Sequence, residues 1–222
     1  MNTLKTYISQ HFNSLQLLFV ATLFSLALLT ARIKLTHSFF YLFLVWNLFL
    51  ATIPYIISSY LISKLKFKRL PLLIYSLVWL AFLPNAPYII TDLWHLRLAS
   101  NSIIWLDLLI VFCFASTGLL LFFISIKDMK QLLQCYLPQR VNTLLFNALF
   151  FLCGFGIYLG RFLRYNSWEI ISNPIQLIQD VFTIIFQPQV HTKAWLFTLL
   201  FGLFLRLGFW MFTQLCKIKN YE

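Results

Sequence analysis

Long apolar segments alternate with short polar ones along nearly the whole chain. Each apolar segment holds roughly 20 residues, the length that a helix needs to cross the hydrocarbon core of a bilayer. The pattern predicts membrane spans at residues 14–31, 39–62, 70–90, 103–126, 141–160 and 194–215. We therefore expect an all-α fold, a polytopic transmembrane helical bundle of six spans, formed as a single membrane domain over residues 1–222.

A further apolar segment, residues 174–187, has a different pattern from the spans. Pro174 follows Ser172 and Asn173, which is typical of a helix start, and Pro188 ends the segment. Polar side chains form one stripe along this segment, and apolar side chains form a wide opposite face. The pattern predicts an interfacial helix, either a lid over a polar site or a passive connector.

The third predicted span contains a break. Pro84 and Pro87 each lack a backbone N–H and crowd the preceding turn, so the helix should bend or unwind there. Asn85 lies in the break, where its side chain could donate hydrogen bonds to freed carbonyls or bind a substrate. The alternatives are a plain proline kink and an opened backbone that lines a polar cavity.

Composition excludes a soluble globular protein. The chain is 61% hydrophobic and 10% charged, with a mean hydropathy of +0.83, which is too apolar for a soluble core to bury. The first apolar segment exceeds a signal-peptide core and ends without a clean small-residue cleavage site, so we interpret it as a retained span.

Basic residues in the connections predict the orientation. Of the 17 Lys and Arg residues, ten fall on the side that holds both termini, six fall on the opposite side, and Arg206 lies within the sixth span. Cytoplasmic connections of membrane proteins are enriched in Lys and Arg. We therefore expect a protein of the inner membrane with both termini in the cytoplasm. Two polar segments, residues 84–97 and 160–169, then face outward.

The net charge of +11 points to the membrane rather than to nucleic acid. Flanking Lys and Arg residues attract anionic lipid headgroups, and no soluble segment carries a basic stripe with interleaved aromatic residues. The expected partner is therefore the lipid bilayer, and no nucleic acid. The four cysteines show no CxxC spacing, so they indicate neither a disulfide framework nor a thiolate metal site.

Asp92 and His95 are the first candidate catalytic residues. Their i, i+3 spacing places both on one face if the segment is helical. A carboxylate beside an imidazole can orient a general base or supply two metal ligands. The structural alternative is that Thr91 or Asp92 caps a short interfacial helix.

Asp107 is the third candidate, because a carboxylate near the start of the fourth span is costly unless it is paired. Arg161 and Arg164 are the expected partners, and the alternatives are a structural ion pair and a catalytic or substrate-binding role. Arg206, midway along the sixth span, likewise needs a partner or must extend its side chain to the interface.

The second polar segment supplies candidates for binding an anion. If the helix continues past the fifth span, Arg161 and Arg164 form a fork that suits phosphate or carboxylate. Asn166, Trp168 and Glu169 follow, and headgroup anchoring is the alternative role for the Arg and Trp residues. Just before them, the GxxxG of residues 156–160 would let another helix approach closely.

The stretches PNAPYIITDLWHL and GRFLRYNSW resemble a bacterial family of predicted membrane proteins known as domain of unknown function 1361. The resemblance covers most of the chain. It implies a multi-span bacterial membrane protein and no established activity.

The leading functional hypothesis is an outward-facing site that binds or processes an anionic or lipid-linked substrate. Acid/base or metal-ligand groups would be Asp92, His95, Asp107 and Glu169. Substrate-binding groups would be Asn85, Arg161, Arg164, Asn166 and Trp168. An ion-coupled transporter and a non-catalytic membrane assembly protein are the alternatives. The sequence identifies no metal, cofactor or protein partner.

Overall fold

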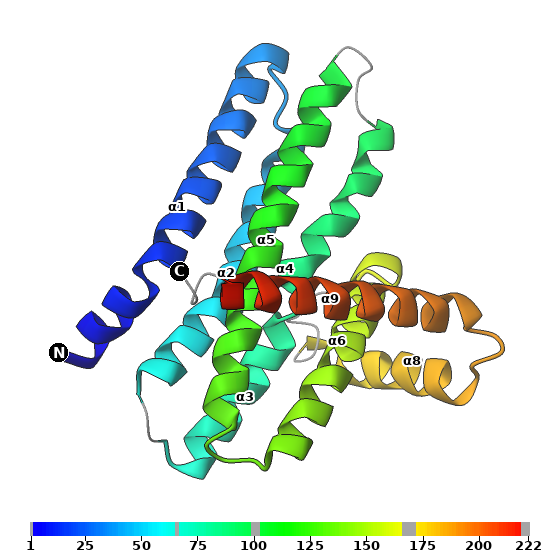
Figure 1. Ribbon diagram of the computed structural model, residues 1–222. Coiled ribbons are helices and arrows are strands. Elements are labelled where there is room, and N and C mark those ends of the chain that lie inside the picture. Colours follow the sequence, from blue (N-terminus) through cyan, green and yellow to red (C-terminus); the bar gives the residue numbers. More distant parts are fainter. Residues whose placement is uncertain (1, 65–66, 99–102, 166–171, 219–222) are drawn as a thin grey trace. The chain divides into compact units, whose positions relative to one another are not determined.

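The computed structural model describes residues 2–64, 67–98, 103–165 and 172–218, and every regular element within these ranges is helical (Figure 1). The first unit contains α1 (Asn2–Thr36), η1 (Phe40–Leu42), α2 (Phe43–Ser63), α3 (Arg69–Phe82), α4 (Asn85–Tyr88), η2 (Ile89–Leu98) and α5 (Ile104–Leu133). The second contains α6 (Gln139–Phe162), α8 (Pro174–Phe186) and α9 (Thr192–Ile218). The units divide at Cys135, and each is described by itself.

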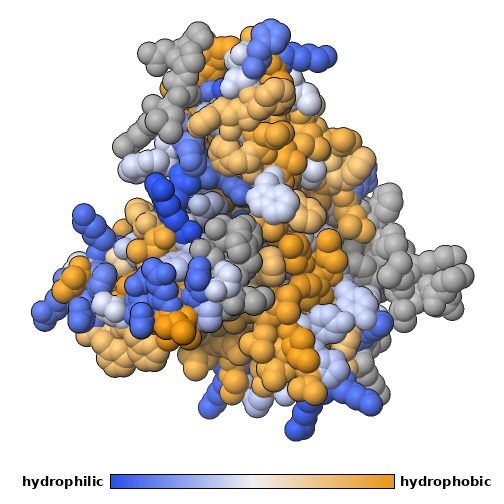
Figure 2. Space-filling model, turned by 180° about the vertical axis from the view of Figure 1, so that it is seen from behind, coloured by the Kyte–Doolittle hydropathy of each residue, from blue (hydrophilic) through white to orange (hydrophobic). Residues whose placement is uncertain are grey.

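Six helical segments are long and apolar enough to cross a membrane, which confirms the predicted fold class. They are Ser14–Thr36, Phe40–Ser63, Arg69–Leu96, Ile104–Leu133, Gln139–Phe162 and Thr192–Lys217. Apolar residues also cover a large part of the face seen in Figure 2. The chain is a multi-pass membrane protein. Its organisation as a single membrane domain stays a prediction.

The third span runs to Leu96 rather than residue 90, and two other spans also extend further than predicted. The first runs to Thr36 rather than residue 31, so Arg32 lies within a helix and not in a connection. The fourth continues past residue 126 to Leu133, which brings Asp128 inside the span, where it is buried. In both cases the charged side chain suggested the end of an apolar segment, although the helix continues through it.

Helix α5 is the centre of the first unit. It packs against α1, α2, α4 and η2, and it is the most enclosed of the six spans. A hydrogen-bond chain joins it to two neighbours. Trp79 of α3 donates its Nε1–H to Ser125 Oγ over 2.8 Å, and Ser125 donates to the carbonyl of Pro54 in α2 over 3.0 Å. Three spans are thereby fixed to one another through polar contacts in an apolar interior.

The predicted break in the third span is present between α3 and η2. Helix α3 ends at Phe82, and the short α4 begins at Asn85. The Asn85 side-chain amide donates to the carbonyl of Phe82 over 3.0 Å, as expected for a freed carbonyl. Gly118 of α5 faces the break, because a Cβ added there would lie 2.6 Å from the carbonyl oxygen of Ala86.

The second unit is built on close packing of α6 against α9. A Cβ added to Gly154 would lie 2.9 Å from the carbonyl oxygen of Thr198 and 3.2 Å from the backbone nitrogen of Gly202. The close approach thus uses Gly154 and Gly202, whereas the predicted pair, Gly156 and Gly160, is half-buried. The glycine spacing correctly indicated helix packing, but the contact is centred elsewhere on α6.

Helix α8 confirms the predicted helix between the fifth and sixth spans, with Pro174 at its start. Trp195 of α9 donates its Nε1–H to the carbonyl of Ile184 over 3.1 Å. The large side chains of Ile175, Phe182 and Phe186 are exposed. Its position at a membrane interface stays a prediction.

Candidate functional site

Helix α1 ends and α5 begins at the same end of the first unit (Figure 1). Polar side chains of α1, α2, η2 and α5 make contacts in this part of the unit. Because neighbouring helices run antiparallel, these residues lie at the same end of the unit although they are far apart in the sequence. The gathered side chains form two groups on either side of the short helix η1. One group is centred on Asp107 and the other on Asp92.

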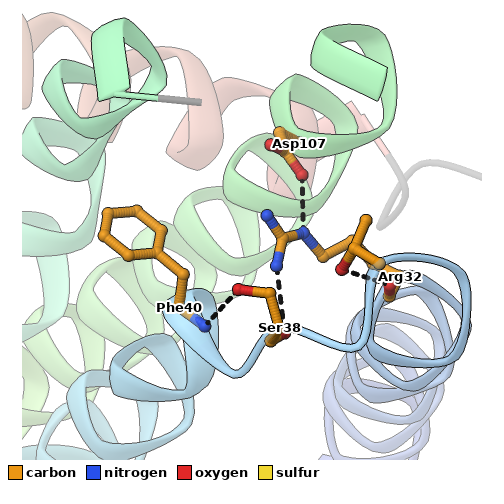
Figure 3. A network of polar contacts seen from close by, with 5 residues as sticks. Arg32, Ser38, Phe40 and Asp107 are labelled. Carbon is orange, nitrogen blue, oxygen red and sulfur yellow. Dashed lines mark hydrogen bonds and ion pairs between the residues drawn. The ribbon is translucent and has the colours of Figure 1, made fainter. Parts of the chain in front are cut away.

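The Asp107 group is an ion pair with Arg32. Arg32 Nε donates to Asp107 Oδ1 over 2.9 Å, and both side chains are buried (Figure 3). Arg32 also donates through Nη1 to the carbonyl oxygen of Ser38 over 3.0 Å. The partner of Asp107 is therefore Arg32, which corrects the expectation of Arg161 or Arg164. Close pairing and added hydrogen bonds offset the cost of desolvating both charges.

Tyr41 of η1 lies against this ion pair. Tyr41 is fully buried, and the guanidinium carbon of Arg32 lies 4.7 Å from the centroid of the Tyr41 ring. The geometry is that of a cation–π contact, which is stronger away from water. The hydroxyl of Tyr41 lies near the Asp107 carboxylate.

The Asp92 group joins η2 to α2. Asn47 of α2 donates its side-chain amide to Asp92 Oδ2 over 2.8 Å, and Asp92 Oδ1 lies 3.6 Å from His95 Nδ1. The Asp92 side chain is 1% exposed, and that of His95 is 28% exposed. A 3₁₀-helix has three residues per turn, so η2 places Asp92 directly below His95. The predicted common face is confirmed.

The capping alternative does not describe this segment. Asp92 lies within η2 with its carboxylate directed at Asn47, and the Thr91 hydroxyl donates to the carbonyl of Tyr88 over 2.7 Å. Both residues sit inside a continuous helical stretch that begins at α4.

Aromatic rings adjoin the imidazole of His95. Its centroid lies 5.0 Å from that of Phe43 and 6.3 Å from that of Phe40. Phe40 and Tyr41 are consecutive residues of η1, and their rings are 5.0 Å apart. Helix η1 therefore lies between the two groups and contributes one ring to each.

The second polar segment does not have the geometry predicted for it. Helix α6 ends at Phe162, and Arg164 has a φ of 62°, in the left-handed region. The backbone N–H of Tyr165 then donates to the carbonyl of Leu159 over 3.1 Å. Because α6 ends at Phe162 and Arg164 has a left-handed backbone, Arg161 and Arg164 do not share a helical face, which corrects the predicted helical spacing.

The other residues that the sequence singled out belong to the second unit or lie outside the described residues. Arg161 is half-buried and Arg164 is exposed. The side chain of Tyr165 donates to Asp180 Oδ2 of α8 over 2.6 Å, which links the segment just after α6 to that helix. Arg206 is exposed on α9. Asn166, Trp168 and Glu169 lie outside the described residues.

The described residues include no group of three or more His, Cys, Asp or Glu side chains that could hold a metal ion. Asp92 and His95 supply two such groups, and Asn47 supplies an amide beside them. The arrangement is better suited to holding an imidazole in one orientation, which is the use of a carboxylate–histidine pair in proton transfer.

Three residues of the site were missed in the sequence. Arg32 was placed in a connection, Tyr41 in an ordinary apolar segment, and Asn47 inside a predicted span. Asn47 carried a usable signal, since a polar side chain among apolar neighbours in a span usually has a polar partner. Tyr41 carried none, because aromatic residues are common near span ends.

Comparison with known proteins identifies the chain without assigning it chemistry. No curated protein and no solved structure matches it. Residues 46–207 match one family, and this segment includes Asn47, Asp92, His95 and Asp107. The match covers well over half of the chain. The protein therefore belongs to the family described as "Protein of unknown function (DUF1361)".

Proposed function

We propose that this chain is an inner-membrane protein with both termini in the cytoplasm. The polar end of its first unit would face outward and act on an anionic or lipid-linked substrate. The observation that carries the proposal is the Asn47–Asp92–His95 arrangement. A buried carboxylate is fixed by an amide on one side and faces a partly exposed imidazole on the other.

This arrangement suits general acid–base chemistry at His95. The Nδ1 edge of the imidazole faces Asp92, so the Nε2 edge points away from the carboxylate. Asp92 would hold the ring in one tautomer and stabilise its protonated form, and Nε2 would accept or deliver the proton. Asn47 would fix the orientation of Asp92 and is a positioning residue.

The remaining candidates have supporting roles in the proposal. Asp107, neutralised by Arg32, would hold η1 in place rather than transfer protons. Arg161 and Arg164 would bind an anionic group separately, since they do not share a helical face. Asn166, Trp168 and Glu169 remain proposed contributors to the second polar segment.

The contacts at the break favour this proposal over a carrier. Ala86 and Pro87 are buried, the Asn85 amide binds the carbonyl of Phe82, and Gly118 lies against the carbonyl of Ala86. These contacts are those of a packed kink. A substrate-binding break would instead leave backbone groups to line a cavity.

The proposal is tested with purified protein in nanodiscs that contain phosphatidylglycerol or phosphatidylcholine. Native mass spectrometry measures retained lipid, and mass analysis of the lipid extract after incubation detects new products. We expect selective retention of the anionic lipid or a lipid product with the wild type. His95→Gln and Asp92→Asn should reduce product formation by a factor on the order of 10² to 10⁴.

His191→Gln, a change of the same chemical type in the second unit, is the matched control and should behave as wild type. Retention and products that are the same for wild type, both site variants and the control would overturn the proposal.

A further inference from the structure

The partly exposed imidazole of His95 opens onto an apolar surface. Phe40, whose ring adjoins the imidazole, is 42% exposed, and the neighbouring Trp94 is 62% exposed. The Phe40 ring points away from the Arg32–Asp107 pair (Figure 3). Beyond Phe40, the side chains of Phe39 and Leu42 are exposed to 67% and 52%. The Asp92–His95 dyad therefore lies at the edge of an apolar surface that acyl chains would cover in a membrane.

The apolar surroundings of His95 favour a substrate that already lies in the membrane. A free anion approaching His95 from water would lose hydration beside two aromatic rings, with no apolar group of its own to contact them. A lipid headgroup lies at the boundary already, and its chain stays in apolar surroundings throughout. Only the headgroup then has to reach the imidazole.

We propose that the site takes a membrane lipid laterally, with its headgroup at His95 and its acyl chain against Phe40, Phe43 and Trp94. This inference rests on the proposed function, and it names the substrate as an amphiphile that carries its own acyl chain. Phe40 and Phe43 are the residues that determine this specificity, and the imidazole is the group that meets the headgroup.

The test compares two phenylalanines that differ in their relation to His95. Phe40→Ala removes a ring beside the imidazole, whereas Phe49→Ala removes a ring that is 55% exposed further along α2 and pairs with Trp46. Each variant is reconstituted in phosphatidylcholine nanodiscs with a small fraction of phosphatidylglycerol that carries a photoreactive acyl chain. Labelling of the η1 and η2 peptides is measured by mass spectrometry, with and without excess competitor.

We expect Phe40→Ala to lower saturable labelling about three- to tenfold, since one aromatic contact is worth roughly 0.5–1.5 kcal/mol. Phe49→Ala should label as wild type does. Unlabelled long-chain phosphatidylglycerol should abolish the labelling, and glycerol phosphate at equal concentration should leave it unchanged.

Equal labelling of wild type, Phe40→Ala and Phe49→Ala would overturn the inference, as would displacement by glycerol phosphate. The proposed function fails in a different way. If it is wrong, His95→Gln produces no loss of turnover, whether or not labelling depends on Phe40.

Discussion

Arg32 and Asp107 lie 75 positions apart in the sequence, yet their side chains meet 2.9 Å apart in the interior of the first unit. The pair joins the end of α1 to the start of α5, the helix on which this unit is built. The contacts of Arg32 with Ser38 and Tyr41 extend the connection to η1.

Removal of one member of this pair should strongly destabilise the first unit. Asp107→Leu leaves a buried guanidinium without its carboxylate, and the expected loss is about 3–5 kcal/mol. The measurement is thermal unfolding in detergent. Arg32→Leu combined with Asp107→Leu should be far less destabilised than either single variant, because no uncompensated charge remains.

The control for this experiment is Lys34→Leu, which removes an exposed positive charge two residues from Arg32. It should unfold close to the wild-type temperature. A double variant no more stable than the singles would show that the charges are not coupled in the way that the structure indicates.

Gly118→Ala should destabilise the protein even though alanine is the better helix former. The new Cβ would lie 2.6 Å from the backbone oxygen of Ala86, so α4 or α5 must shift. Overpacking of this kind costs about 1–3 kcal/mol, whereas the same change at an open helical position gains about 1 kcal/mol. Thermal unfolding gives the sign directly, and Ser116→Ala on the same helix is the control, expected near wild type.

Arg164→Gly should stabilise the second unit. Arginine pays about 1–2 kcal/mol for the left-handed conformation, and the greater freedom of glycine in the unfolded chain offsets part of the relief. A net gain of about 0.5–1 kcal/mol in thermal unfolding is expected. Arg164→Ala keeps the strained backbone while removing the charge, so it should not show the gain.

Asn47→Leu should impair the Asp92–His95 dyad without touching either residue. The Asp92 carboxylate would lose the amide that binds Oδ2, and a hydrogen bond to a charged group is worth about 1.5–3 kcal/mol. We expect lower stability and lower turnover, with Asn47→Gln giving partial rescue. Full turnover in Asn47→Leu would rule out a positioning role.

Local patterns predicted most of the fold. Apolar segments identified six spans, paired prolines identified the break in the third, and Pro174 marked the start of α8. These features depend on neighbours in the chain, so the sequence displays them. The spacing of Asp92 and His95 was informative for the same reason.

Contacts between distant segments were beyond such patterns. The charge of Arg32 predicted a connection between spans, because no residue near it in the sequence indicates that Asp107 neutralises it. Helical spacing put Arg161 and Arg164 on one face, because an arginine gives no signal of the left-handed conformation that Arg164 adopts just after α6 ends. Asn47 is a polar side chain in an apolar segment, but its partner Asp92 lies 45 positions away in the sequence.

The 3₁₀ winding of η2 makes the distance between Asp92 and His95 sensitive to chain length. Each residue of such a helix turns the chain by about 120°, so one inserted residue would swing the imidazole a third of a turn from the carboxylate. An insertion on the amino-terminal side of Asp92 would instead rotate both residues together and keep their mutual spacing. The dyad therefore tolerates changes before position 92 better than any change of length between the two residues.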